Sequence, residues 1–162
     1  MLILWGIGIG LILLFGFTAF FGAPYLPTLT RRTADALTLL DLKPGQLFLE
    51  HGSGDGRLQV AAAKRGIRSI GYELNPLLVW YSRIKLVRYR QLASVKNANY
   101  WTQSLPKADA IYVFLLNPYM EKLHKKILAE SAKPVRVVSF AFEIPGKKPV
   151  KEINGMRLYI YD

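Results

Sequence analysis

The sequence predicts an α/β fold in which a parallel sheet is flanked by helices and preceded by one apolar helix. Three observations lead to this prediction. Residues 47–76 place a glycine-rich turn and an alanine-rich stretch between two short apolar runs, which is typical of a strand–helix–strand unit. Residues 108–116, ADAIYVFLL, form an apolar run of the kind buried in the centre of a parallel sheet. Residues 2–23 carry no charge.

The chain has room for one domain of ordinary size. Of its 162 residues, we expect 43–162 to form the domain, behind a linker and short helix over 24–42. The absence of cysteine excludes disulfides and thiolate chemistry. The net charge is +11, and every Lys and Arg lies at or beyond Arg31, so an anionic surface is a favoured partner. Membrane headgroups and nucleic acid both fit that charge.

Residues 1–23 are predicted to be a transmembrane anchor. At about 1.5 Å per residue the apolar run reaches roughly 30 Å, the thickness of the hydrocarbon core. A cleaved signal peptide is the alternative, but nothing basic precedes the run. Arg31 and Arg32 follow it, so the positive-inside tendency predicts a single-pass membrane protein with a cytoplasmic domain.

The segment behind this anchor leads into the first strand. Residues 23–30, APYLPTLT, are punctuated by proline, as expected at an exit from the bilayer. Residues 33–42 then place Ala34, Leu37 and Leu40 at helical spacing before Lys43, Pro44 and Gly45. We therefore expect a short helix ahead of the first strand, which is predicted over 46–51.

A glycine loop joins this strand to a helix predicted over 55–65. Glycines let a strand turn sharply into a helix and let a ligand lie against the backbone. Dinucleotide loops usually read G-x-G-x-x-G and bind a pyrophosphate, which the carboxylates of Glu50 and Asp55 would repel. S-adenosylmethionine carries a sulfonium and an ammonium and no phosphate, so this loop favours it. The candidate cofactor-binding residues here are Glu50, Gly52, Ser53, Gly54, Asp55 and Gly56.

Glu73 is the second part of the candidate cofactor site. It ends a short apolar run over 69–72 and lies about 20 residues beyond the first glycine, where a nucleoside-binding α/β fold places an acid for the ribose hydroxyls. Leu74 follows it and belongs to the same candidate site.

These motifs resemble a known family. The runs GSGDGR, AAAKRG and GYELNP, the residues from Trp80 to Arg83, and the upstream APYLPT are similar to membrane-anchored protein lysine methyltransferases that modify the ATP synthase c subunit and the adenine nucleotide translocase. The resemblance runs from about Ala23 to Asp162. It implies a Rossmann-like class I methyltransferase sheet and methyl transfer from S-adenosylmethionine to a lysine amine. A plain strand–helix connection is the alternative for the loop, and the spacing of Glu73 weighs against it.

Two positions depart from the family pattern. The resemblance places an acid at Asn99, after a strand predicted over 95–101, where it would accept from the adenine amino group. Asparagine accepts through its carbonyl oxygen, so we expect a weaker contact, with Tyr100 beside it in the cofactor site. His51 replaces an aliphatic residue; we interpret it as packing at the strand end, with cofactor contact as the alternative. His124 is interpreted as a solvated surface residue, and no metal site is predicted.

The acceptor site is predicted at the end of the apolar run over 108–116. Amine-modifying class I methyltransferases often carry Asn/Asp-Pro-Pro-Tyr/Phe there, and this chain has Asn117, Pro118 and Tyr119. In this interpretation Asn117 orients the acceptor nitrogen and Tyr119 offers an electron-rich face to the cationic centre. An ordinary strand-to-helix turn is the alternative. No general base is assigned, because an activated methyl mainly needs an amine lone pair held in line.

The remaining residues complete the α/β pattern. A helix from Asn75 to about Gln91 carries an apolar stripe, interpreted as facing the core, that consists of Leu77, Trp80, Tyr81, Ile84 and Val87. The cations beside the stripe, Arg83, Lys85, Arg88 and Arg90, contact either solvent or lipid headgroups. Because the aromatics follow the supposed core stripe, nucleic acid is a weaker partner. A helix over 119–130, a strand over 134–142 and a hairpin of 150–153 with 157–161 across Asn154 and Gly155 follow.

Three functional hypotheses remain open at the level of sequence. The first is a methyltransferase that acts on a lysine near the bilayer surface of a membrane protein. The second is a methyltransferase of a membrane small molecule, such as a lipid amine or quinone precursor. The third is a non-catalytic membrane tether whose basic face binds anionic lipid or nucleic acid.

Overall fold

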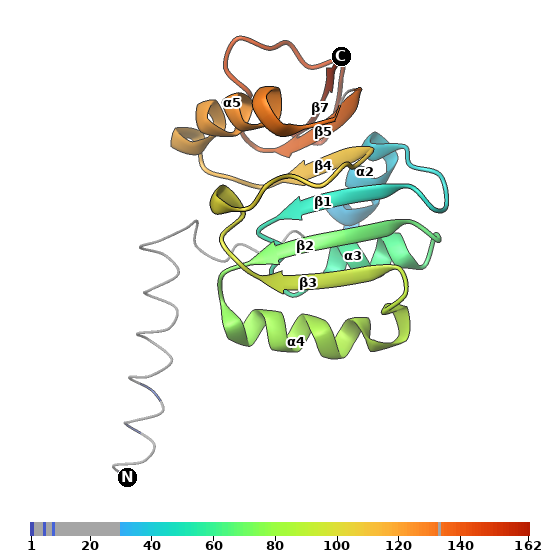
Figure 1. Cartoon of the computed structure of the whole chain (residues 1–162), viewed down its shortest axis with the longest axis vertical. Helices are drawn as coiled ribbons and strands as arrows, with labels where there is room; N and C mark the ends of the chain where they lie inside the picture. Colours follow the sequence, from blue (N-terminus) through green and yellow to red (C-terminus); the bar gives the residue numbers. More distant parts are fainter. Residues whose placement is uncertain (2–4, 6–7, 9–29, 133) are drawn as a thin grey trace.

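The computed structural model describes residues 1, 5, 8, 30–132 and 134–162 (Figure 1). Within these residues, no helix has both the length and the apolar character needed to cross a bilayer. The predicted anchor over 1–23 lies almost wholly outside the described residues.

The described part of the chain forms one seven-stranded sheet in the order β3-β2-β1-β4-β5-β7-β6 (Figure 1). Its strands are β1 (Leu47–His51), β2 (Arg68–Glu73), β3 (Ala93–Asn97), β4 (Ala110–Val113), β5 (Val135–Phe140), β6 (Lys151–Ile153) and β7 (Met156–Tyr161). The helices are α2 (Thr30–Leu40), α3 (Arg57–Ala63), α4 (Pro76–Leu86) and α5 (Met120–Glu130), with 3-10 turns η1 (Val87–Tyr89), η2 (Tyr100–Thr102) and η3 (Asn117–Tyr119). Neighbouring strands from β1 to β5 pair in parallel, and β7 is antiparallel to β5 and β6. The predicted α/β class is confirmed.

The core lies on both faces of this sheet. Along β4, Ile111 and Val113 join the buried cluster beneath α5, whereas Ala110 and Tyr112 join the cluster beneath α2 and α3. This alternation follows from the period of two in a strand and explains why the whole run is apolar. Figure 1 shows α4 along the β3 border of the sheet, with α5, β5 and β7 at the opposite end.

The third strand is displaced from its predicted range. β3 ends at Asn97, and the second half of the predicted range, 98–101, leaves the sheet. The Asn99 side chain accepts a hydrogen bond from the Trp101 N–H at 3.1 Å and begins η2. Asparagine competes for backbone donors in this way, and the local bond ends the strand. The adjacent Tyr100 is buried rather than paired in the sheet.

The closing hairpin is confirmed. Asn154 and Gly155 both have positive φ, 52° and 79°, and they connect β6 to β7. Two successive residues of positive φ give a turn whose twist matches that of paired strands, which is why Asn-Gly is favoured there.

The interpretation of the α4 stripe is wrong. Its five residues are exposed: Leu77 by 44%, Trp80 by 64%, Tyr81 by 49%, Ile84 by 51% and Val87 by 61%. The face that packs on α3 and the sheet instead consists of Val79, Ser82 and Leu86. Both faces of α4 follow a helical period, so the period could not show which one is buried.

Two further side chains differ from expectation. The prediction of a solvated His124 is wrong, because this residue is half-buried and its Nδ1 lies 2.8 Å from the Tyr161 hydroxyl. Ala34, predicted on the apolar face of its helix, is exposed, while Ala36, Leu39 and Leu40 of α2 pack into the core.

Candidate cofactor and acceptor site

The glycine loop between β1 and α3 has the conformation that its alternating glycines suggest. Gly52, Gly54 and Gly56 have φ values of 76°, 54° and 73°, which L-residues rarely adopt. The N–H groups of Gly52 and Ser53 both donate to the Tyr72 carbonyl, at 2.9 and 3.0 Å. The loop is therefore held against the end of β2.

Glu73 connects this loop to the start of α4. One carboxylate oxygen accepts from the Gly54 N–H at 2.9 Å, and the other accepts from the Asn75 N–H at 2.8 Å. Each oxygen has a second lone pair, so the carboxylate can still accept from a vicinal diol. The structure thus joins two predicted site residues, Gly54 and Glu73, by a direct hydrogen bond.

Glu50 is buried near the end of β1, and its carboxylate is not fully hydrogen-bonded. Its side chain is 5% exposed, and within the described residues Oε2 has no hydrogen-bond partner. Burial, and then the charges of Asp55 and Glu73, raise the pKa of this carboxyl well above its usual range. A buried acceptor with no donor is costly, and it fits a ligand that brings a cationic donor.

Glu50→Gln is expected to stabilise the free protein and to weaken cofactor binding. A carboxyl whose pKa is raised on folding gives stability below its unfolded pKa of about 4.3, and that stability is lost as the pH rises through the folded value. The wild-type free energy of unfolding should therefore fall relative to that of the variant as the pH increases, by about 1–3 kcal/mol at neutral pH. Urea unfolding of the detergent-solubilised chain at several pH values measures this difference. Parallel pH curves for the two proteins would contradict it.

Asp55 has partners within the protein. Arg57 Nε lies 2.8 Å from one carboxylate oxygen, and Lys85 Nζ lies 2.8 Å from the other. Partial burial acts to raise the pKa of Asp55, but the hydrogen bonds and charges of Arg57 and Lys85 outweigh it and lower the pKa. Since Lys85 belongs to α4, this pair also connects α4 to the glycine loop. Cofactor binding by Asp55 stays a prediction.

The predicted adenine side of the site contains an aromatic stack. His51 is 1% exposed and lies parallel to Tyr100, with ring centroids 4.3 Å apart. Burial, and then the charge of Lys126, lower the pKa of His51 to about 3, so its ring is neutral near pH 7. The Asn99 side-chain oxygen already accepts from Trp101, and the Leu74 carbonyl accepts from the Asn97 amide.

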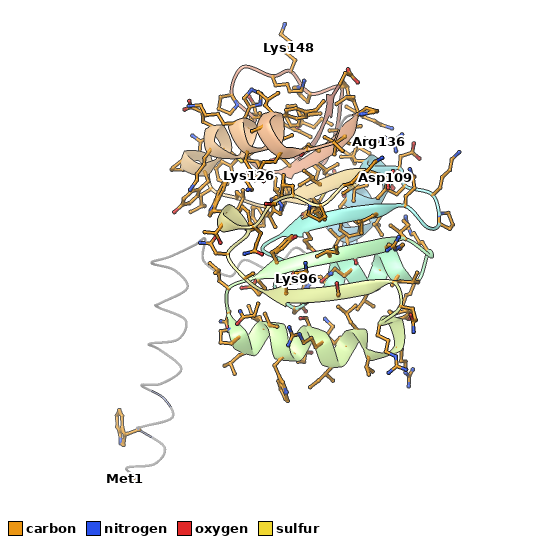
Figure 2. All side chains as sticks on the ribbon, viewed as in Figure 1. Met1, Lys96, Asp109, Lys126, Arg136 and Lys148 are labelled. Carbon is orange, nitrogen blue, oxygen red and sulfur yellow. The ribbon has the colours of Figure 1, made fainter. Side chains whose placement is uncertain are left out.

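The predicted acceptor residues lie directly after β4. Asn117 and Pro118 are exposed in η3, and Tyr119 is half-buried with its ring 6.1 Å from that of Trp101. Lys122 Nζ lies 4.5 Å from the Trp101 ring centroid, so the Trp101 ring already accommodates one alkylammonium group. The parallel pairing of β4 with β1 and of β1 with β2 brings η3, the glycine loop and Glu73 to the same edge of the sheet. Asp109, at the opposite edge, accepts from the Leu47 N–H at 2.8 Å (Figure 2).

Gly71 and Asn75 are site residues that the sequence analysis missed. A Cβ on Gly71 would lie 2.6 Å from the Ser53 side chain and 2.7 Å from Gln59 Oε1, so this glycine allows the loop to approach β2. Asn75 is buried, and its side-chain oxygen accepts from the Leu77 and Leu78 N–H groups, which fixes the start of α4 behind Glu73. The Asn-Pro pair is a helix-start signal that could have identified Asn75.

Comparison with known proteins identifies a family and a fold for this chain. Residues 50–151 match the family described as the ANTKMT methyltransferase domain. The chain belongs to this family. Its fold is that of class I methyltransferases: an RNA methyltransferase from Salinibacter ruber, solved with S-adenosyl-L-homocysteine, superposes with a TM-score of 0.76 at 24% identity over 84% of this chain and 92% of that one.

Two curated relatives are similar to most of this chain. The chain is 34% identical to the Xenopus laevis lysine N-methyltransferase named for the ATP synthase c subunit, over 128 residues that are 78% of this chain and 56% of that protein. It is 36% identical to the adenine nucleotide translocase lysine N-methyltransferase of Mus musculus over 144 residues, 86% of this chain and 62% of that protein. The chain thus spans little more than half the length of these relatives.

Proposed function

We propose that this chain is an S-adenosylmethionine-dependent methyltransferase that N-methylates a lysine of a membrane protein. The contact between the Glu73 carboxylate and the Gly54 N–H carries the proposal, because it sets the ribose-binding acid against the glycine loop. Membership of the ANTKMT methyltransferase domain family supports the reaction class, and both relatives described above are named as lysine N-methyltransferases.

The residues at the carboxyl end of the sheet fit this cofactor. Glu73 offers lone pairs to the ribose hydroxyls, and the glycine loop presents an exposed backbone without a Cβ atom at Gly52. Glu50 offers a buried carboxylate with one oxygen in need of a donor, which the cofactor's ammonium would satisfy. Asn99 and Tyr100 would lie beside the adenine.

The reaction needs little acid–base chemistry from the protein. Bound S-adenosylmethionine supplies a methyl group that is already activated by its sulfonium. Asn117 orients the acceptor amine through its side-chain oxygen, Pro118 fixes the turn, and Tyr119 places an aromatic ring beside the amine. Desolvation of the lysine in this aromatic setting favours its neutral, nucleophilic form.

The substrate is proposed to present its lysine close to a bilayer. The two relatives are named for the c subunit of ATP synthase and for the adenine nucleotide translocase. In this chain the uncharged run over 2–23 serves as a single-pass membrane anchor, with the domain on the cytoplasmic side and near an anionic membrane surface. A lysine near the headgroups is then within reach of a site tethered by a short linker.

Transfer of labelled methyl groups tests the proposed function. The full chain in detergent is incubated with membrane extract and S-adenosylmethionine carrying a tritiated methyl group, and protein and lipid are then separated. We expect label in protein, recovered as methyl-lysine after hydrolysis. Asn117→Ala should lower the rate at least about tenfold with little change in cofactor affinity, whereas Gln91→Ala, which changes an exposed amide before β3, should keep the wild-type rate.

The distribution of label decides among the three hypotheses. Label confined to lipid would favour a small-molecule substrate and contradict protein methylation. If neither methyl transfer nor cofactor binding is observed, the hypothesis of a non-catalytic basic membrane tether remains.

A further inference from the structure

The outward face of α4 is apolar, although none of the other described elements covers it. We define the outer α4 face as Leu77, Trp80, Tyr81, Ile84 and Val87. The spacing of three and four residues keeps these side chains on one side of the helix, opposite Val79, Ser82 and Leu86. Figure 2 shows side chains projecting from α4 on the side away from the sheet.

This concentration of exposed apolar side chains is specific to α4 and η1. From residue 30 onward, and within the described residues, the other large hydrophobic side chains that are exposed are Leu128 on α5 and Val150 just before β6. Single exposed hydrophobic residues need no explanation, but a contiguous row of five along α4 and η1 indicates an interaction surface.

The charge around this row has one sign. From 74 to 108 the sequence contains no Asp or Glu, and its cations are Arg83, Lys85, Arg88, Arg90, Lys96 and Lys107. The Arg83 guanidinium donates to the Val95 carbonyl, and no acidic side chain of the described residues pairs with Arg88 or Arg90. Asp55 is neutralised by Lys85 of α4 and by Arg57.

We propose that the outer α4 face docks on the surface of an anionic lipid bilayer. The aliphatic side chains of this face, Leu77, Ile84 and Val87, would enter the boundary between headgroups and acyl chains. Trp80 and Tyr81 have the amphipathic rings favoured at that level, and Arg88 and Arg90 would contact lipid phosphates. Protein sites for single-stranded nucleic acid also combine aromatic residues with cations. However, Leu77, Ile84 and Val87 offer no stacking surface to bases.

Docking in this way would place the site at the membrane. α4 begins three residues after Glu73, and Asn75 caps its first turn. The Lys85–Asp55 ion pair fixes the same helix to the glycine loop. The carboxyl edge of the sheet would therefore lie beside the bilayer, but the docking itself does not require that methyl transfer occurs.

A single nitroxide label tests the contact, because the chain has no cysteine of its own. Ile84→Cys and Leu128→Cys change side chains of similar exposure, 51% and 48%, on α4 and α5. Each full-length variant is spin-labelled and reconstituted into vesicles of phosphatidylcholine and phosphatidylglycerol. Collision rates with oxygen, which is enriched in lipid, and with a water-soluble nickel chelate are then measured. We expect position 84 to be accessible to oxygen and protected from nickel, and position 128 to show the reverse.

The other results would overturn the proposal. Nickel accessibility at position 84 equal to that at 128 would show a solvated helix. Protection from both reagents would show that protein covers α4, whether residues 2–23, a second copy or a substrate. Protection by added single-stranded RNA, with none from lipid, would indicate nucleic acid. Unchanged circular dichroism and thermal unfolding of both labelled variants would confirm that the fold is retained.

Substitution of the two arginines beside this face provides a second test of the proposal. In the labelled Ile84→Cys protein, Arg88→Gln with Arg90→Gln should lower the ratio of lipid-exposed to water-exposed label about 30-fold at low salt. Lys148→Gln with Lys151→Gln is the matched control and should leave the ratio unchanged; Figure 2 shows Lys148 at the opposite end of the molecule from α4. An unchanged ratio in the arginine variant, or equal docking on pure phosphatidylcholine, would overturn the requirement for anionic lipid.

Discussion

A Glu73→Ala variant is expected to lose at least about 100-fold in affinity for S-adenosylmethionine. Two effects add. The variant has no carboxylate to accept from the ribose hydroxyls, and hydrogen bonds to a charged group are worth about 1.5–3 kcal/mol each. It also leaves the Gly54 and Asn75 N–H groups without the acceptor that orders the loop and the start of α4. Isothermal titration of the detergent-solubilised chain measures the loss.

Two further variants test whether the loss of affinity is specific to the Glu73 carboxylate. Glu121→Ala changes an exposed carboxylate on α5 that pairs with Lys125, so its affinity should match the wild type. Glu73→Gln keeps one acceptor oxygen but presents an amide donor to either Gly54 or Asn75, so we expect intermediate affinity. Full affinity in Glu73→Ala would remove Glu73 from the cofactor site.

The local signals of the site were readable from the sequence. Alternating glycines indicated a loop of positive φ, and all three glycines adopt it. The spacing of Glu73 placed an acid at the end of β2, and it reaches the loop. These features depend on the backbone of short segments and on parallel pairing, which the apolar runs already indicate.

Features set by long-range packing were not readable. The two apolar faces of α4 have the same period, so only the position of α3 and β3 decides that Val79 and Leu86 are buried while Trp80 and Ile84 are exposed. The ion pair of Asp55 with Lys85 joins residues 30 apart in sequence. His124 pairs with Tyr161 of the last strand, a contact that no local pattern could indicate.

The role of Gly71 also depends on long-range packing, and its substitution is expected to lower stability. The glycine lies in β2 opposite Glu50, and its backbone is compatible with other residues, so the constraint is steric. A Cβ in Gly71→Ala would lie 2.6 Å from both Cβ and Oγ of Ser53, and 2.7 Å from Oε1 of the buried Gln59. Gln59 is held by its amide, which donates to Ser69 and the Ser94 carbonyl, so it cannot move freely.

Gly71→Ala should therefore lower the free energy of unfolding by about 1–3 kcal/mol and also weaken cofactor binding. The clash pushes Ser53, and with it the loop that carries Gly52 and Gly54, away from β2. Urea unfolding and cofactor titration measure the two effects on one protein. Because both have one cause, they should recover together when the clash is relieved.

The double variant Gly71→Ala/Ser53→Gly tests that cause. The Ser53 hydroxyl is buried with no hydrogen-bond partner among the described residues, so removing it sacrifices no bond. Partial recovery of stability and affinity is expected, because the contact with Gln59 remains. Additive losses in the double variant would show that the two side chains do not collide and that Gly71 is required for another reason. Recovery would establish that the absence of a Cβ at Gly71 sets how closely the glycine loop approaches the acid at the end of β2.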